Sequence, residues 1–150
     1  MLTLQYQIVI EATPAKIWAV LTEIERYSQW ATAFSPRSQF EGDWFEGEVI
    51  AFFDPDFGGT RALVDKIEFH KVIEYHHTGV FSAEHQIDID TDMARKWIGS
   101  REMFVLEPDE HGVTLRVQVQ TDQAFVAMFN QGWQKALPMI KQLSETDDTA

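Results

Sequence analysis

Two adjacent histidines, His76 and His77, are the side chains of this sequence best suited to proton transfer or metal binding near neutral pH. They lie in KVIEYHHTGVF, residues 71–81, which reads as a strand, so the two rings should point to opposite faces and cannot bind one metal ion together. His77 shares its face with the apolar Ile73 and Tyr75, so we expect His77 to point inward and His76 to face solvent. Two interpretations of His77 stay open: a buried histidine hydrogen-bonded to a neighbour, or a polar group inside a pocket.

Alternating acids at Asp88, Asp90 and Asp92 resemble the start of a calcium-binding loop. The glycine expected after the third acid is Met93, and the position of the closing glutamate is Gly99. We therefore predict a solvated acidic edge at this segment, with no metal site.

Arg61 and Asp65 fall on an otherwise apolar face of the predicted strand 60–69, beside Leu63 and Ile67. A buried carboxylate needs a partner, so the two could form an ion pair inside the sheet. A strand bulge that turns both side chains outward is an equal alternative. No nucleophile elbow, phosphate loop or zinc-binding helix is present, and we assign no catalytic residue and no cofactor.

Large apolar side chains are the main evidence for a ligand-binding cavity. They either fill a solid core or line a residual pocket, and we expect a pocket because so many of them are large. The candidate ligand-binding residues are Phe52, Tyr75, His77, Trp97, Met103, Phe125, Phe129 and Trp133, with Phe57 as a further aromatic of the set.

The elements that position these residues follow from periodicity. Residues 2–10 alternate and predict a strand, and two short helices follow, the first with Thr13 as N-cap and Pro14 in its first turn. Residues 38–120 predict antiparallel strands joined by hairpins, although 82–96 fit no element well. A long amphipathic helix should span about 122–143, followed by a flexible acidic tail over 144–150.

This order predicts an α+β fold in a single domain, residues 1–150, with one curved antiparallel sheet and the helices gathered on one face. A strongly curved sheet cannot lie flush against a straight helix, so space for a ligand should remain between them. The long helix offers aromatic side chains to line that space. It also carries Gly132, which permits close approach, and Pro138, which should bend its last turns.

Composition narrows the classes of partner. The formal charge of −12 argues against nucleic acids and anionic membranes, which both require a positive protein surface. Apolar runs are too short for membrane insertion, and the N-terminus lacks the basic region of a secretion signal. The sequence has no cysteine, which suits a reducing compartment, so we expect a cytoplasmic protein.

Three stretches resemble one superfamily in order and spacing. They are ATPAKIWAVLTEIERYSQW (12–30), GDWFEGEVIAF (42–52) and FNQGWQKALPMIKQL (129–143). The sequence is similar to the START-like (SRPBCC) superfamily with its helix-grip fold, and more narrowly to bacterial proteins related to the C-terminal domain of the heat-shock-protein ATPase activator (AHSA-type). The resemblance implies a curved sheet wrapped around a long C-terminal helix. It leaves function open, because fold does not fix function.

Three functions follow as hypotheses. The first is non-catalytic binding of a small hydrophobic or aromatic ligand in the cavity between the sheet and the C-terminal helix. The second is a cyclase or dehydratase type of enzyme acting on a polyketide-like substrate, for which His77 or the Arg61–Asp65 pair would supply acid–base chemistry. The third is a chaperone-associated interaction module, by family analogy. The sequence also leaves open whether the protein forms a homodimer.

Overall fold

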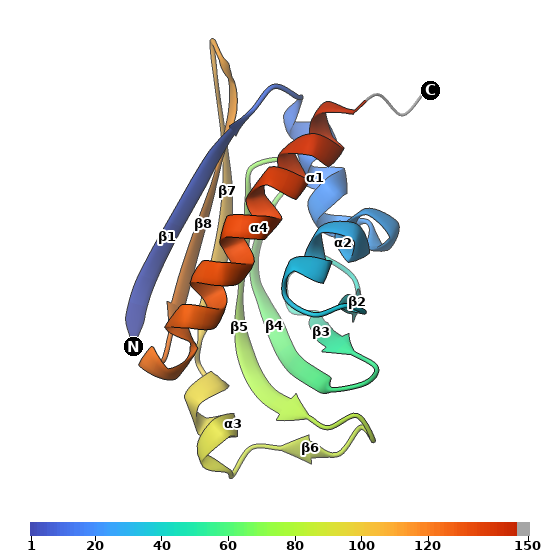
Figure 1. The fold of residues 1–150 in the computed structure, drawn as a ribbon, viewed down its shortest axis with the longest axis vertical. Coiled ribbons are helices and arrows are strands. Elements are labelled where there is room, and N and C mark those ends of the chain that lie inside the picture. The colour runs from blue at the N-terminus through green and yellow to red at the C-terminus, as the bar shows by residue number, and fades with distance from the viewer. Residues whose placement is uncertain (147–150) are drawn as a thin grey trace.

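One antiparallel sheet forms the frame of the protein in a computed structural model that describes residues 1–146 (Figure 1). The strand order is β1-β8-β7-β5-β4-β3-β2, and the two-residue β6 pairs with β5 outside this path. The bounds of the strands are β1 Leu2–Ile10, β2 Gln39–Glu41, β3 Val49–Asp54, β4 Gly58–Glu68, β5 Val72–Phe81, β6 Ile87–Asp88, β7 Arg101–Asp109 and β8 Gly112–Thr121.

Helices cover one face of this sheet, as expected for an α+β fold. α4 crosses the face diagonally, with α1 beside its C-terminal half and α2 beside its middle (Figure 1). The bounds of the helices are α1 Pro14–Thr22, α2 Ile24–Trp30, α3 Asp92–Trp97 and α4 Val126–Glu145, with short 3₁₀ turns η1 Ala31–Ala33 and η2 Gln123–Phe125. The helix-grip architecture predicted from the sequence is confirmed. Within residues 1–146, no helix is long and apolar enough to cross a membrane.

Alternation along the strands decides which side chains face the helices. On β8, Val113, Leu115, Val117 and Val119 are all buried, as the sequence pattern indicates. β1 pairs with this strand over its whole length, from Leu2 opposite Thr121 onward. The inner face of this side of the sheet is therefore continuous and apolar.

Local sequence signals fix where the helices begin. The Thr13 hydroxyl accepts a hydrogen bond from the Lys16 backbone N–H at 3.2 Å, and Pro14 occupies the first turn, so α1 starts where the capping residues predict. Trp18 and Leu21 of α1 are buried, as predicted.

The C-terminal helix extends beyond its predicted end. Ser144 is buried within α4, and Glu145 accepts hydrogen bonds from Lys141 and from the backbone N–H of Glu11. These contacts hold the last turn against the start of α1, so the prediction that a flexible tail begins at residue 144 is wrong for 144–146. The rest of that tail, 147–150, lies outside the described residues.

Gly132 gives α4 the close approach that was expected of it. A Cβ atom at this position would lie 2.2 Å from Cε1 of Phe34, so only glycine leaves room for that ring. Pro138 lies inside α4, and the helix continues past it to Glu145.

The strand β4 carries two register shifts against β5, one of them at Asp65. The shift turns Asp65 outward, where its carboxylate lies 2.7 Å from Nδ1 of His76 and 3.6 Å from the guanidinium of Arg101. Arg61 is exposed. The bulge alternative is therefore confirmed, and the Arg61–Asp65 pair inside the sheet is wrong.

Residues 82–96, which fit no element in the sequence, form β6, a turn and α3 at the lower end of the sheet (Figure 1). Asp88 organises this turn by accepting hydrogen bonds from the backbone N–H groups of Asp90 and Thr91 and from the Thr91 hydroxyl. Thr91 then caps α3 through a hydrogen bond from the N–H of Ala94.

Candidate functional site

A cavity of about 860 Å³ lies between the inner face of the sheet and the helices α2 and α4. Its volume falls within the range of pockets that hold drug-sized molecules. The walls are mainly aromatic and aliphatic, and they come from both the sheet and the helices. The wall residues that matter below are Tyr27, Trp30, Phe34, Trp44, Phe52, Tyr75, His77, Trp97, Glu102, Phe104, Phe129 and Trp133.

Three polar side chains from the two central strands meet on the cavity wall. Tyr75 of β5 is directly opposite Glu102 of β7 in the strand register, so their side chains share the inner face. His77 lies two residues along β5 on the same face, and its Nε2 is 2.6 Å from Oε2 of Glu102. All three residues are buried. We call Tyr75, His77 and Glu102 the polar cluster.

Aromatic rings surround the polar cluster closely. The Tyr75 ring lies 5.0 Å from that of Phe52 and 6.0 Å from that of Trp44, measured between centroids. The imidazole of His77 lies 5.2 Å from the indole of Trp97, which meets it edge-on. The polar cluster is thus set into a wall of aromatic rings.

The environment keeps the nearby phenols protonated. Burial raises the pKa of the Tyr75 phenol well above its ordinary value, and the neighbouring Glu102 carboxylate raises that pKa further. Burial likewise raises the pKa of Tyr27, again with a contribution from Glu102. Both phenols therefore remain hydroxyl donors at neutral pH.

Several buried polar atoms of the cavity wall have no hydrogen-bond partner among the described residues: Nδ1 of His77 and Nε1 of both Trp44 and Trp133. A buried polar atom without a partner costs free energy, so such atoms are rare in folded proteins. The two indoles are donors only, whereas the histidine nitrogen is an acceptor whenever Nε2 carries the proton. Trp44 and Trp133 therefore bring two unpaired donors, and His77 one unpaired acceptor, to the residues of the cavity wall.

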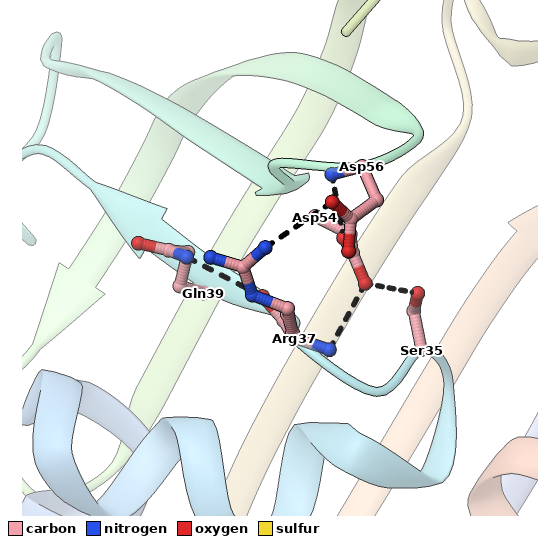
Figure 2. A network of polar contacts seen from close by, with 5 residues as sticks. All are labelled: Ser35, Arg37, Gln39, Asp54 and Asp56. Carbon is pink, nitrogen blue, oxygen red and sulfur yellow. Dashed lines mark hydrogen bonds and ion pairs between the residues drawn. The ribbon is translucent and has the colours of Figure 1, made fainter.

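A polar network joins five side chains, three of which, Ser35, Gln39 and Asp54, line the cavity (Figure 2). Asp54 at the end of β3 is buried and accepts hydrogen bonds from the Ser35 hydroxyl at 2.6 Å, from the Arg37 N–H at 2.9 Å and from the Asp56 N–H at 2.8 Å. These donors lower the pKa of Asp54, the Ser35 hydroxyl most. The Arg37 guanidinium pairs with Asp56 at 3.1 Å, and the Gln39 side chain donates to the Arg37 carbonyl. The network ties the segment after η1 to the β3–β4 turn.

Exposed apolar side chains surround the mouth of the cavity. Phe57 of the β3–β4 turn is 74% exposed and Met93 of α3 is 62% exposed, yet both border the cavity. Ile87 and Met128 add apolar surface from β6 and from the first turn of α4. An apolar molecule would meet apolar surface before it entered.

Most of the candidate residues predicted from the sequence come together in this cavity. Its walls include Phe52, Tyr75, His77, Trp97, Phe129 and Trp133, and Phe57 lies at the mouth. Phe125 is placed behind the wall, where its ring stacks on Trp97 at 4.7 Å.

Met103 does not line the cavity, which corrects the sequence prediction. Its strand partners are Glu74 and Gln118, and its side chain is on the outer face of the sheet. The inner positions of β7 are its neighbours Glu102 and Phe104. The alternation of Glu102, Phe104 and Leu106 in the sequence could have identified that face. Sequence analysis missed Glu102 because a carboxylate is seldom placed on an inner face.

Both interpretations of His77 describe it partly: the ring is hydrogen-bonded to a neighbour, and it also lines the cavity. The segment with Asp88, Asp90 and Asp92 shows no group of three metal-binding side chains, and neither does the rest of residues 1–146.

Residues 11–145 match the family described as activator of Hsp90 ATPase homolog 1-like protein. No curated protein matches the sequence. The solution structure of the Aha1 dimer from Colwellia psychrerythraea is 23% identical with a TM-score of 0.75, and the alignment covers 99% of each chain.

Two further solved structures share the fold at lower identity. A protein from Mesorhizobium loti is 18% identical with a TM-score of 0.76, over 97% of this chain and 99% of that chain. A protein of the dynemicin biosynthetic locus is 15% identical with a TM-score of 0.68, over 96% of this chain and 47% of that chain.

Proposed function

Because this chain belongs to the activator of Hsp90 ATPase homolog 1-like family and has the helix-grip fold, we propose that it binds a small, mainly apolar aromatic molecule between the sheet and α4. The observation that carries this proposal is the cavity of about 860 Å³, whose aromatic walls hold buried polar atoms without partners. Apolar walls supply affinity, and a few placed polar groups orient the ligand.

The unpartnered atoms define part of the ligand's chemistry. The indole N–H groups of Trp44 and Trp133 require acceptors, such as a carbonyl, ether or hydroxyl oxygen. His77 can accept a hydrogen bond at Nδ1 while its Nε2 donates to Glu102. A fused or substituted aromatic ring with one or two oxygen atoms satisfies both requirements.

Direct binding measurements test the proposal. Four of the five tryptophans, all but Trp18, line the cavity, so a molecule such as 2-naphthol should quench their fluorescence as it binds. Phe129→Ala should weaken this binding by about tenfold, since an aromatic contact of roughly 1.4 kcal/mol is lost. Native mass spectrometry of gently purified protein should show a bound small molecule. Absence of both quenching and a co-purified molecule would remove the basis for the proposal.

A second candidate function is acid–base catalysis of the cyclase or dehydratase type, favoured by the buried His77–Glu102 contact. When Nε2–H of His77 donates its hydrogen bond to Glu102, Nδ1 keeps a lone pair, and an imidazole oriented by a carboxylate is a suitable general base. The neighbour from the dynemicin biosynthetic locus supports testing polyketide-like substrates.

His77→Ala separates the two functions. A binding protein should retain much of its affinity for 2-naphthol, because the aromatic walls remain. An enzyme that uses this histidine as acid or base should lose roughly a hundredfold or more in turnover of its substrate.

The remaining alternatives have narrower support. The description of the family is the support for a chaperone-associated module, and the dimeric neighbour from Colwellia psychrerythraea is the support for a homodimer. Light scattering after size-exclusion chromatography tests the dimer, with a monomer mass at all concentrations as the result against it.

A further inference from the structure

We propose that the ligand carries a positively charged nitrogen, either a protonated amine or a quaternary ammonium group, placed against Glu102. This inference rests on the proposed binding function and specifies its chemistry. It follows from the balance of charge in the cavity, from the environment of one carboxylate and from the arrangement of the aromatic rings around it.

The charged side chains of the cavity wall are almost all of one sign. Three carboxylates line it, those of Asp54, Asp88 and Glu102. No lysine or arginine of residues 1–146 does so, and His77 is the single side chain of the wall that can become positive. A cavity with this balance favours cations and disfavours anions such as fatty acids.

Two of the three carboxylates accept hydrogen bonds that organise turns at the edge of the cavity. Asp54 accepts hydrogen bonds from Ser35, Arg37 and Asp56, and Asp88 accepts from Asp90 and Thr91. Both act as turn-forming residues at the mouth. Their role is structural, so Glu102 is the carboxylate of the cavity wall that is left to contact a ligand.

Glu102 is buried, and its hydrogen-bond partner is a histidine. A histidine neutralises a carboxylate only when it is protonated, whereas a buried carboxylate is costly without a positive partner. The one possible counter-charge inside the polar cluster is therefore a titratable imidazole. A ligand cation would supply a second one.

Aromatic rings around this charge suit the same ligand. Tyr75 has Phe52, Trp44 and Phe104 within 6.2 Å between ring centroids, and Glu102 is its strand partner. Faces of aromatic rings attract cations, and cages of such rings recognise quaternary ammonium groups. An arylammonium ion would therefore gain from the rings, from the carboxylate and from the apolar walls at once.

A pair of isosteric probes tests the charge without any substitution. Phenyltrimethylammonium and tert-butylbenzene have nearly the same shape and differ in charge. Titration of the whole protein, followed by tryptophan fluorescence and calorimetry, should show at least about tenfold tighter binding of the cation. Equal affinities, or tighter binding of the neutral compound, would overturn the inference while leaving the binding function in place. Failure of both probes to bind, together with failure of 2-naphthol, would count against the proposed function itself.

Two matched variants test whether Glu102 causes the preference for the cationic probe. Glu102→Gln keeps a hydrogen-bond acceptor for His77 and removes the charge, so the preference for the cation should fall to within about threefold. Glu107→Gln, on the same strand but exposed and paired with Arg116, should keep the full preference. Binding of tert-butylbenzene by the Glu102→Gln protein shows that its cavity is intact. An undiminished preference in that variant would place the cation elsewhere and contradict the assignment to Glu102.

Discussion

The two halves of α4 carry one apolar stripe but meet different surroundings. In the C-terminal half, Ala136, Leu137 and Ile140 are buried in the main core cluster, which includes residues of β1, β8 and α1. In the N-terminal half, Phe129 and Trp133 are as well buried, yet they border the cavity. We call these halves, each together with the side chains of other elements that pack against it, the packed half and the hollow half. Burial of a helix face therefore does not by itself report a solid core.

The sheet accounts for this difference. β1 and β8 run alongside α4, whereas β4 and β5 curve as they approach the lower end (Figure 1). The register shifts of β4 add to that curvature, because a bulge bends a strand and increases its twist. Space opens where the strands leave the helix, and the polar cluster lies on the strand β5 and its neighbour β7.

Removal of a large side chain from the packed half should have the greatest effect on stability. Trp18→Ala should lower the free energy of unfolding by about 3–5 kcal/mol, because it leaves a void among well-packed atoms. Trp18 is 8% exposed and its ring is 5.9 Å from that of Phe69. Trp97→Ala in the hollow half should cost less, since that ring already borders empty space. Denaturant unfolding measures both, and a loss below about 1 kcal/mol for Trp18→Ala would mean that the packed half is loose.

In the hollow half, between Phe129 and Trp133, Gly132→Ala should destabilise the protein by up to about 2 kcal/mol. The new methyl group would overlap Phe34, and overpacking costs about 1–3 kcal/mol, whereas alanine gains about 1 kcal/mol over glycine in a helix. The near atoms are Cε1 and Cδ1 of the Phe34 ring, at 2.2 and 2.4 Å.

A double-mutant cycle isolates the cause of that loss. In a Phe34→Ala background, Gly132→Ala should become neutral or stabilising, because the clash is absent and the helix preference remains. A loss that persists unchanged in this background would show that the helix itself, and not the ring, requires glycine.

The network at the mouth of the hollow half should make stability depend on acid pH. The pKa of Asp54 is lower in the folded protein than in the unfolded chain, where it is about 3.9. Its contribution is therefore complete above the unfolded value and is lost as the pH falls through the folded one. Asp54→Asn should reduce stability at neutral pH, and the difference from the parent should vanish in strong acid.

The neighbouring Asp56 provides the control for this experiment. Its carboxylate forms an exposed pair with Arg37, so Asp56→Asn should change stability little at any pH. Urea unfolding at several pH values measures both variants. A difference for Asp54→Asn that is constant with pH would show that its charge is not what the network needs.

Periodicity in the sequence predicted much of this molecule. Alternation placed the inner face of β8, and capping residues placed the start of α1. The three motifs of the resemblance predicted the helix-grip fold, which is confirmed. These features depend on local sequence or on spacing along one element. The turn at Asp88 and the helix α3 lack such a pattern, because side-chain hydrogen bonds define them.

The polar cluster shows where sequence reasoning reached its limit. His77 and Tyr75 were identified from one strand, but Glu102 is 25 residues from His77 in the chain. Their contact depends on the register between β5 and β7, which a single sequence does not specify. The volume of the cavity likewise depends on strand curvature. Aromatic content alone cannot separate a lined cavity from a filled core.

The smallest effect is expected at Met103, and it sharpens the contrast between the two faces of β7. Met103 lies between Glu102 and Phe104 in the chain, but its strand partners are Glu74 and Gln118 on the outer face. Met103→Ala should therefore change affinity for 2-naphthol by less than about twofold and stability by about 0.5 kcal/mol, as for other substitutions outside the core. Phe104→Ala, one residue away but buried, should reduce both, with a stability loss of about 3–5 kcal/mol. A marked loss of binding in Met103→Ala would mean that ligand reaches the outer face, contrary to the strand register that orients the whole cavity.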